Sequence, residues 1–336
     1  TKSLIEKLYA EKGYLNVEVK PLLLIPDTKF NTNIPKNSDL IRDIVFNISE
    51  NKKTKINKII FEGNNSFSDF RLRWKMKETK QQPFYMFWRS TFDNSNFIED
   101  LELLSTFYRN KGYRDFEILK DTIQYYDDSK KMDIILSVSE GEKYKYRNFS
   151  WEGMSLFSEE DLQTTLALEK GEQFSDEDFN LALYSRVQGL YLDRGYIYSR
   201  IEPQITPIGI DSLDIHFVIT ENHKVYINSI IVQGNTRTRE NVIRRQLRIF
   251  PGDVYNQERI ARSYREVMML NFFANAAPNI LPVSDDKVDV EFNVEEKPAG
   301  QASANMGYSQ YLGLTGGGGI SLPNFRGKGQ SLRSWP

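Results

Sequence analysis

The sequence contains no cysteine among its 336 residues, and it contains only two histidines. The lack of cysteine excludes disulfide bonds, thiolate metal sites and a cysteine nucleophile. Neither His216 nor His223 stands in a cluster of carboxylates, so we expect no metal site. No nucleophile is paired with a base along the sequence, and we therefore expect no catalytic residues, no cofactor and no enzymatic activity.

Long hydrophobic runs are also missing. No stretch of about 18 apolar residues is present, so the sequence predicts no transmembrane helix, and no signal peptide is visible. The 44 basic and 46 acidic residues leave a net charge of −2, which gives no indication of nucleic-acid binding. Residues 1–12 already have the pattern of a helix, and we expect the chain to be a fragment of a longer protein with both ends cut.

A repeated pair of strands organises what is present. In each copy one strand ends in glutamate, a short polar link follows, and a second strand ends in glycine. Three copies separate these two residues by the same 13 positions: Glu50 and Gly63, Glu140 and Gly153, Glu221 and Gly234. A fourth copy reaches Glu296, and no matching glycine follows it. The spacing between successive glutamates is that of a small domain, which predicts tandem domains.

Two helices are expected inside each unit. The first begins after an N-cap residue in each complete unit, at Ser68 (running to about Glu78), at Ser158 with Asp161 as a capping box (159–168), and at Thr238 (239–247). The second covers 96–111, 176–194 and 257–271. Two of these helices end at Gly112-Tyr113 and Gly195-Tyr196, where glycine supplies the left-handed cap. Asn271, the usual substitute for glycine, takes this place in the last unit.

The element order of each unit is therefore β-α-α-β-β. A three-stranded mixed sheet with two helices on one face accommodates this order. The strand after each helix-ending residue is expected at an edge of the sheet, at 14–25, 113–125, 196–207 and 273–283. The last two contain Pro203, Pro207, Pro278 and Pro282, and proline is tolerated at edges. The segment 113–125 has no proline, which makes it the best template for an added strand.

The residue composition and pattern change after Glu296. Small and uncharged residues alternate over 302–309, a glycine tract follows at 316–319, and the segment 324–330 reads Asn-Phe-Arg-Gly-Lys-Gly-Gln. The glycine tract does not have the spacing of a phosphate-binding loop. We expect strands here, with Ala302, Ala304, Met306 and Tyr308 on a lipid-facing side.

These features resemble known protein families. Tandem β-α-α-β-β units with a helix-ending Gly-Tyr and a strand-ending glutamate resemble POTRA domains. Followed by Asn324, Phe325, Gly327, Gly329 and Gln330, they resemble the BamA family of outer-membrane barrel-assembly proteins. The resemblance covers the whole chain and implies an α+β fold. Its expected parts are the C-terminal part of one POTRA domain (1–53), three complete domains (54–142, 143–223 and 224–297) and the first strands of a truncated transmembrane β-barrel (298–336).

The resemblance also implies a function. It places the POTRA array in the periplasm of a Gram-negative cell, attached to the outer membrane through the barrel. The implied partners are unfolded outer-membrane β-barrel proteins and accessory assembly lipoproteins, and no nucleic acid is implied. Insertion itself needs the barrel, which is almost wholly absent from this chain.

Two surfaces are candidates for contact with partners. The candidate edge strand carries Tyr113, Arg114, Phe116, Ile118, Leu119, Ile123 and Tyr125. A basic cluster in the last unit consists of Arg237, Arg239, Arg244, Arg245 and Arg248. It is either a solvated face or a contact with an acidic partner or lipid headgroups. The aromatic insert at 80–95 exceeds the compact family pattern, and it either folds onto its own domain or contacts a partner or membrane surface.

Two other functions remain open at this stage. In the first alternative, the chain is a purely structural scaffold that docks accessory lipoproteins and never contacts unfolded clients. Alternatively, it would belong to a protein-translocating barrel of the same superfamily, although those usually have two POTRA domains.

Overall fold

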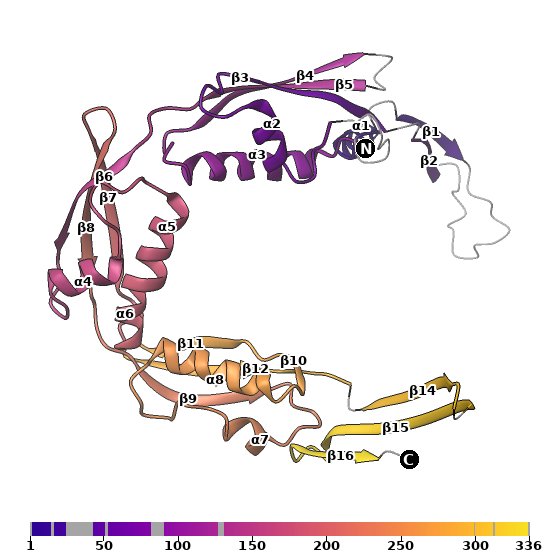
Figure 1. Cartoon of the computed structure of the whole chain (residues 1–336), viewed down its shortest axis with the longest axis vertical. Helices are drawn as coiled ribbons and strands as arrows, with labels where there is room; N and C mark the ends of the chain where they lie inside the picture. The colour runs from indigo at the N-terminus through magenta and orange to yellow at the C-terminus, as the bar shows by residue number, and fades with distance from the viewer. Residues whose placement is uncertain are drawn as a thin grey trace, which may run out of the picture. The chain divides into compact units, whose positions relative to one another are not determined.

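The computed structural model describes residues 2–14, 17–24, 43–50, 53–81, 91–126, 131–298, 300–311 and 313–334. Contacts divide the chain into two compact units, and the boundary runs through residues 143–223. The repeats are described one at a time below (Figure 1). Within the described residues, no helix is both long and apolar enough to cross a membrane.

The first, partial repeat contains one helix and two strands. Helix α1 (Lys2–Glu11) ends at Gly13, which has a φ of 86°, and the antiparallel strands β1 (Glu18–Leu24) and β2 (Asp43–Ser49) form a two-stranded sheet. Gly13 ends the helix because the left-handed conformation costs glycine little.

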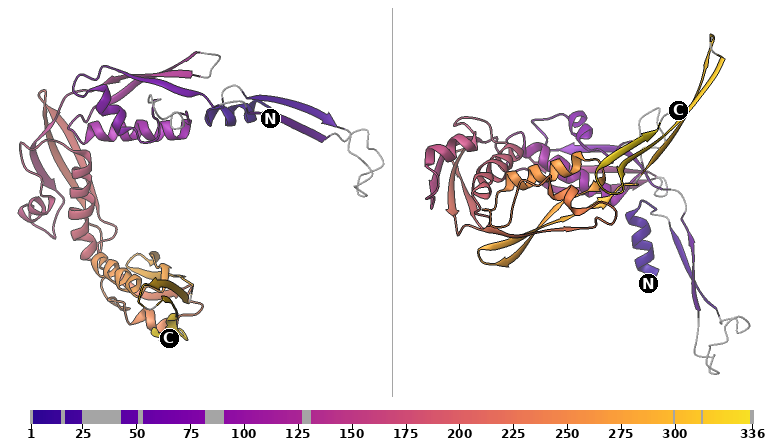
Figure 2. Two further views of the ribbon diagram at one scale, coloured as in Figure 1. Left: turned by 45° about the vertical axis from the view of Figure 1, so that its right-hand side comes forward. Right: turned by 90° about the horizontal axis from the view of Figure 1, so that it is seen from below.

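The repeat at 54–142 contains β3 (Lys55–Glu62), α2 (Asp69–Lys75), α3 (Asn94–Arg109), β4 (Glu117–Tyr126) and β5 (Lys131–Ser139). Strand β5 lies in the centre, parallel to β3 and antiparallel to β4. Both helices cover one face of this sheet, as Figure 1 and the left view of Figure 2 show. Alternate residues of β5 are buried, and they form one core with Leu72, Leu104 and Tyr108 of the helices.

The repeat at 143–223 contains β6 (Lys145–Glu152), α4 (Glu159–Leu166), a helical segment, β7 (Arg200–Ile208) and β8 (Ser212–Thr220), with strand order β6-β8-β7. The capping box of Ser158 and Asp161 is confirmed. The second helix is not uniform, because α5 (Asp176–Asn180) passes into a π-helix (Leu181–Val187) and then into α6 (Gln188–Asp193).

The repeat at 224–297 contains β9 (Tyr226–Gln233), α7 (Glu240–Arg244), α8 (Gln257–Met269), β10 (Phe273–Asn275), β11 (Pro278–Ser284), β12 (Lys287–Asn293) and β13 (Glu295–Glu296). Strand β12 is central between β11 and β9, and β10 pairs with β13. Asn271 ends the second helix with a φ of 59°, as predicted. The core includes Phe273, Val290 and Phe292.

All three predicted first helices are too long, since α4 ends at Leu166 instead of residue 168 and α7 ends at Arg244 instead of residue 247. Helix α2 stops at Lys75 instead of Glu78, because the buried carboxylate of Asp100 accepts the backbone N–H groups of Lys77, Glu78 and Thr79. Helix α7 begins at Glu240 with Arg239 as its N-cap, so the predicted N-cap Thr238 is wrong.

The predicted edge strands begin too early. Residues 113–116 form a turn, and strand β4 begins only at Glu117. The cause is local packing, since Phe116 is buried and its ring stacks on Tyr108 at 4.0 Å between centroids. Likewise β7 begins at Arg200 rather than Tyr196, and the segment 273–283 is divided between β10 and β11.

Neighbouring repeats meet through one recurring hydrogen bond. The carbonyl of the residue that ends each second helix accepts a backbone N–H from the start of the next repeat. The pairs are Thr54 to Gly13 (2.9 Å), Tyr144 to Gly112 (2.9 Å) and Val225 to Gly195 (2.8 Å). The glycines that end these helices therefore also provide the carbonyl acceptors at the joints between repeats.

The segment after Glu296 forms a separate antiparallel sheet of β14 (Gln301–Ser309), β15 (Gly313–Phe325) and β16 (Gln330–Ser334). Met306 lies opposite Gly316, and Tyr308 lies opposite Leu314. Residues that face each other across two strands share one face of the sheet, so Ala302, Ala304, Met306 and Tyr308 lie on a single apolar face. Met306 and Tyr308 are each 79% exposed.

Candidate functional site

The recurrent glutamates bind the loop that follows the recurrent glycine. Glu140 accepts hydrogen bonds from Ser66 N (3.0 Å), Ser66 Oγ (2.7 Å) and Tyr108 Oη (3.0 Å). Glu221 accepts from the N–H groups of Ser155 (2.8 Å) and Leu156 (3.0 Å), from Ser155 Oγ and from Tyr191 Oη (3.3 Å). Each carboxylate therefore fixes the start of the first helix of its own repeat. The loop partners lie 65 to 74 residues from their glutamates and the tyrosines lie 30 to 32 residues away, and the periodicity of the sequence does not reveal either set.

Glu296 makes the same bonds with different partners. It accepts from Thr236 Oγ1 (2.9 Å), Arg237 N (3.0 Å) and Thr238 N (2.6 Å). Val267 stands where the other repeats have a tyrosine, and the guanidinium of Arg237 approaches the carboxylate instead, at 3.3 Å. Burial opposes ionisation of this side chain, but the hydrogen bonds from Thr238, Thr236 and Arg237 outweigh it and lower the pKa of Glu296 to about 2.

Close packing within each repeat explains why the recurrent positions 63, 153 and 234 are glycine. A Cβ atom at Gly63, Gly153 or Gly234 would lie 2.1–2.2 Å from the carbonyl oxygen of Val138, Ile219 or Val294, respectively. Each of these carbonyls belongs to the residue two positions before the recurrent glutamate. All three glycines have φ between 82° and 90°. Each glycine therefore packs against the strand that leads to the glutamate of its own repeat, which is Glu140, Glu221 or Glu296, and not against the glutamate 13 positions before it.

Strand β4 is the open edge of the first complete repeat. It pairs only with β5 among the described residues, and it runs for ten residues without proline. The register shifts between Ile118 and Lys120, which leaves Leu119 as an extra residue in a bulge. Leu119 is 62% exposed and Tyr125 is 47% exposed, whereas Ile118 and Ile123 pack against the core.

The opposite edge, β3, is partly covered by side chains of its own repeat. The guanidinium of Arg73 donates to the carbonyl of Ile59 (3.0 Å), and the N–H of Ile59 donates to Gln81 Oε1 (3.3 Å). In the last repeat Arg244 donates to the carbonyl of Ile230 on β9 in the same way (2.8 Å). Covered backbone groups are not free to pair with a partner strand. Within the described residues, β4 is thus the less covered of the two edges of the first complete repeat.

The predicted edge residues do not all lie on the strand. Tyr113, Arg114 and Phe116 precede β4, and the hydroxyl of Tyr113 donates to Ser66 Oγ (2.8 Å). Leu119, Ile123 and Tyr125 lie on β4, and Leu119 and Tyr125 are exposed. Tyr125 lies opposite the buried Met132 and therefore shares the core face with Ile123.

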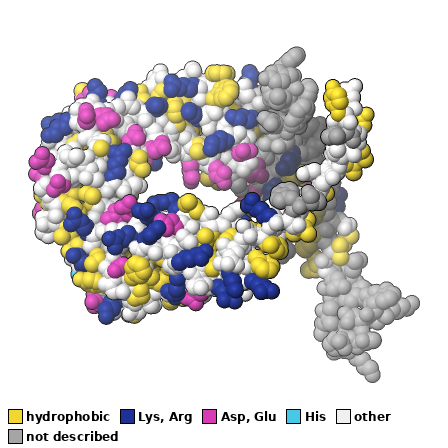
Figure 3. Space-filling model, turned by 60° about the horizontal axis from the view of Figure 1, so that its bottom comes forward, with side chains coloured by type: hydrophobic (Ala, Val, Ile, Leu, Met, Phe, Trp, Pro, Cys, Tyr) yellow, Lys and Arg dark blue, Asp and Glu magenta, His cyan; other side chains and the backbone are white. Residues whose placement is uncertain are grey.

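Most of the predicted basic cluster is occupied within the repeat. Arg237 contacts Glu296, Arg244 contacts Glu240, and Arg248 contacts Glu266 at 2.9 Å. Among the described residues, Arg239 and Arg245 alone of the five form no ion pair. The visible face in Figure 3 likewise mixes Lys and Arg with Asp and Glu side chains.

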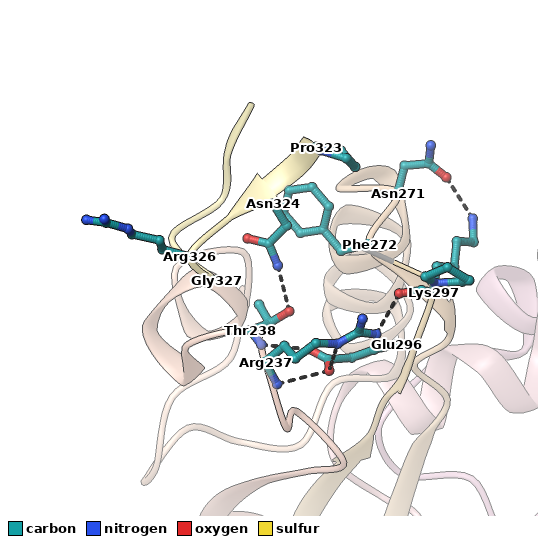
Figure 4. A pocket seen from close by; sticks show the side chains of 11 residues that line it. Arg237, Thr238, Asn271, Phe272, Glu296, Lys297, Pro323, Asn324, Arg326 and Gly327 are labelled. Atoms are coloured by element: carbon teal, nitrogen blue, oxygen red, sulfur yellow. Dashed lines mark hydrogen bonds and ion pairs between the residues drawn. The ribbon is translucent and has the colours of Figure 1, made fainter. Parts of the chain in front are cut away.

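The segment 324–330 folds as a tight turn against the last repeat (Figure 4). Asn324 Nδ2 donates to Thr238 Oγ1 (2.8 Å), and Asn324 Oδ1 accepts the N–H of Gly329 (2.8 Å). The carbonyl of Gly327 accepts the N–H of Arg239 (2.9 Å), and a Cβ at Gly327 would lie 2.0 Å from the carbonyl of Arg237. This turn and the Glu296 loop line one cleft of about 310 Å³. The predicted signature residues Phe325 and Gln330 pair with each other across β15 and β16.

One polar row was not foreseen from the sequence. His216 Nδ1 lies 2.9 Å from Ser150 Oγ, and His216 Nε2 lies 3.1 Å from Glu152 Oε2. These are cross-strand neighbours of β6 and β8, and the Glu152 side chain is 70% exposed. Within the described residues, no group of three or more His, Cys, Asp or Glu side chains could hold a metal ion.

The insert at 80–95 lies largely outside the described residues, which omit 82–90. At its start, Lys80 Nζ donates to the carbonyl of Met76, and at its end Asp93 caps α3. Neither interpretation of the insert is tested by these contacts.

The repeat fold defines the class of protein. A family model described as "POTRA: Surface antigen variable number repeat" matches residues 54–141, 144–222 and 225–297. The chain belongs to the POTRA family. A crystal structure of Haemophilus influenzae BamA POTRA domains 3–5 has the same fold, with a TM-score of 0.61 and 24% identity, over 72% of this chain and 96% of that one.

The chain is also similar to individual proteins of known name. The chain is 31% identical over 333 residues to the outer membrane protein assembly factor BamA of Neisseria meningitidis, covering 97% of this chain and 40% of that protein. It is 26% identical over 292 residues to BamA of Nitratidesulfovibrio vulgaris, covering 85% and 37%. The predicted resemblance to the BamA family is thereby confirmed. The chain spans half or less of the length of the curated relatives that it matches.

Proposed function

We propose that the chain is the periplasmic part of a Gram-negative outer-membrane protein assembly factor. It receives unfolded β-barrel clients and docks accessory lipoproteins, and the clients bind by adding a strand to a POTRA sheet edge. The names of its relatives support the assembly role. The observation that carries the binding mode is the edge strand β4, which pairs only with β5 among the described residues and exposes Leu119 and Tyr125.

Backbone pairing suits a factor that accepts many sequences. An added strand bonds through N–H and C=O groups, which all clients share, and side chains contribute at alternate positions only. Strands β7 and β11 each carry two prolines, and each proline removes one donor. Strand β4 therefore offers the longest uninterrupted template among these three edges.

We also propose that β14–β16 are the first strands of the outer-membrane barrel. Their sheet has one face with Met306, Tyr308 and Leu314 exposed to solvent and a second face of small polar residues and glycine. Membrane barrels have this pattern, with the apolar face toward lipid.

Site-specific photo-crosslinking tests the proposed binding mode. We expect a photoreactive residue at Leu119 or Tyr125 to crosslink to unfolded barrel proteins in cells. Val283 on β11 is the matched control, since it is 53% exposed on an edge interrupted by prolines. Equal crosslinking from Val283 would contradict the proposal, and crosslinks to folded accessory proteins alone would favour the docking scaffold.

A further inference from the structure

A second surface of the repeat at 54–142 is a groove on the helical side of its sheet, between α2 and α3. It has a volume of about 460 Å³, within the roughly 300–1,000 Å³ of typical ligand clefts. Its walls carry Arg71 and Lys75 from α2, Lys77 after that helix, and Lys111 after α3. The floor is apolar, with Leu103 and the largely buried Phe107.

The four cations lack anionic partners. Among the described residues, Arg71, Lys75, Lys77 and Lys111 form no ion pair, although Arg73 on the same helix pairs with Asp69 at 3.4 Å. Glu177 is the one carboxylate that lines the groove, and it already accepts a hydrogen bond from Asn110 Nδ2 (2.9 Å). The groove thus has an excess of positive charge in a chain whose net charge is −2.

Two of the cations are held over a single aromatic ring. The Arg71 guanidinium lies 5.5 Å from the centroid of Phe107, and Lys75 Nζ lies 4.9 Å from it. The ring attracts each cation, but the two like charges repel each other. A carboxylate placed between them would remove this repulsion and add charge-assisted hydrogen bonds.

We propose that this groove binds an acidic, extended segment of a partner protein, with carboxylates on the four cations and an apolar side chain on Leu103 and Phe107. A groove with a narrow apolar floor accommodates a polypeptide, whereas a bilayer presents a flat array of headgroups. The groove is formed by helices and is separate from the edge strand β4. A test of peptide binding in this groove is therefore independent of a test of the proposed client binding at β4.

The test measures binding of a fluorescein-labelled peptide to the whole chain by anisotropy. The probe alternates Glu and Ser around a central Leu, and the control peptide replaces each Glu with Gln. We expect the acidic peptide to bind, with an affinity that falls as salt increases, and the Gln peptide to bind at least about tenfold more weakly.

Two double variants locate the site. Lys75→Glu with Lys111→Glu is expected to weaken peptide binding by about tenfold or more. Lys58→Glu with Lys131→Glu in the sheet of the same repeat changes the net charge equally and is expected to leave binding unchanged. If the reversed pair perturbs the circular dichroism spectrum, Lys75→Gln with Lys111→Gln replaces it, with a smaller loss expected.

Three results would overturn the proposal. Equal loss in both double variants would indicate a general charge effect, and equal binding of the two peptides would remove the role of the carboxylates. Binding to phosphatidylglycerol vesicles that depends on Lys75 and Lys111, without binding of the acidic peptide, would show a membrane-surface site instead.

Discussion

At the scale of single residues, the repeat depends on a glycine that approaches a carbonyl and a glutamate that binds the loop beyond it. Gly153 illustrates the first part, because its φ is 82° and a Cβ would lie 2.1 Å from the carbonyl oxygen of Ile219. Any side chain must therefore displace the central strand as well as adopt a left-handed conformation.

We expect Gly153→Ala to lower the free energy of unfolding of its repeat by about 3 kcal/mol, since backbone strain and overpacking add. Trp151, buried and stacked on Phe217 at 4.2 Å, reports on this event by fluorescence during denaturant unfolding. Gly171→Ala is the matched control. Gly171 has a φ of 87° but no atom within 4 Å of the added Cβ, so about 1–2 kcal/mol is expected. Equal costs at the two positions would contradict the close-approach argument.

Glu296 illustrates the second part, and its effect on stability depends on pH. Its pKa in the folded chain, about 2, is lower than the ordinary 4.5. The ionised form therefore stabilises the fold above about pH 4.5, and this contribution is lost as the pH falls from about 4.5 towards 2.

We expect Glu296→Gln to destabilise the last repeat by about 2 kcal/mol near neutral pH, because charge-assisted bonds to the loop become neutral ones. The difference from the unsubstituted chain should shrink to nothing near the bottom of that pH window. Hydrogen exchange of the Arg237 and Thr238 amides measures the change, and the exposed neighbour Glu295→Gln is the control. A pH-independent difference would show that charge is not the cause.

At the scale of elements, the decisive feature is which edge of each sheet is free. The backbone of β3 is partly occupied by Arg73 and Gln81, whereas β4 pairs only with β5 in the part of the chain that the structure describes. The Leu119 bulge increases local twist, and beyond it the register from Lys120 to Tyr126 is regular. This regular part is where an added strand would pair.

Adjacent proline substitutions separate folding from binding. Successive N–H groups of a strand point to opposite sides, so of Lys120 and Asp121 one points to β5 and the other outward. We expect one of Lys120→Pro and Asp121→Pro to destabilise the sheet. The other should keep the thermal midpoint and weaken binding of a client-derived peptide by about tenfold. A fold-preserving variant that binds normally would exclude β4 as the template.

The sequence predicts the elements better than the contacts between them. Alternating strand residues and the helix-ending Gly112, Gly195 and Asn271 identify the strands and helices of the complete repeats, because both are local properties. The early end of α2 depends on Asp100, about 20 residues away, and the start of β4 depends on the stacking of Phe116 on Tyr108. The bulge at Leu119 and the pairing of Arg237, Arg244 and Arg248 also come from tertiary contacts, which no local pattern records.

At the scale of the whole molecule, the same joint recurs between successive repeats. Side chains two positions before Gly112 and Gly195 bind the next repeat's second helix. Asn110 Oδ1 accepts from the N–H of Glu177 (3.0 Å), and Asp193 Oδ1 accepts from the N–H of Glu258 (2.8 Å). Each joint is therefore a capping interaction between neighbours.

The array also explains why one repeat is the expected client site. Three complete repeats share one fold, yet their outer strands differ in proline content, and only β4 of the first complete repeat is free of it among β4, β7 and β11. The repeats share one scaffold, and we expect the differences between their edges to decide which repeat binds clients.

The central claim is that an unfolded client strand pairs with β4. Backbone amide spectra of the whole chain, recorded with and without a peptide from a strand of an outer-membrane barrel protein, test it directly. We predict shifts concentrated in 120–126, with contacts between the peptide backbone and alternate β4 residues, and smaller changes in β7 and β11. Binding without amide shifts between Glu117 and Tyr126 would contradict the account.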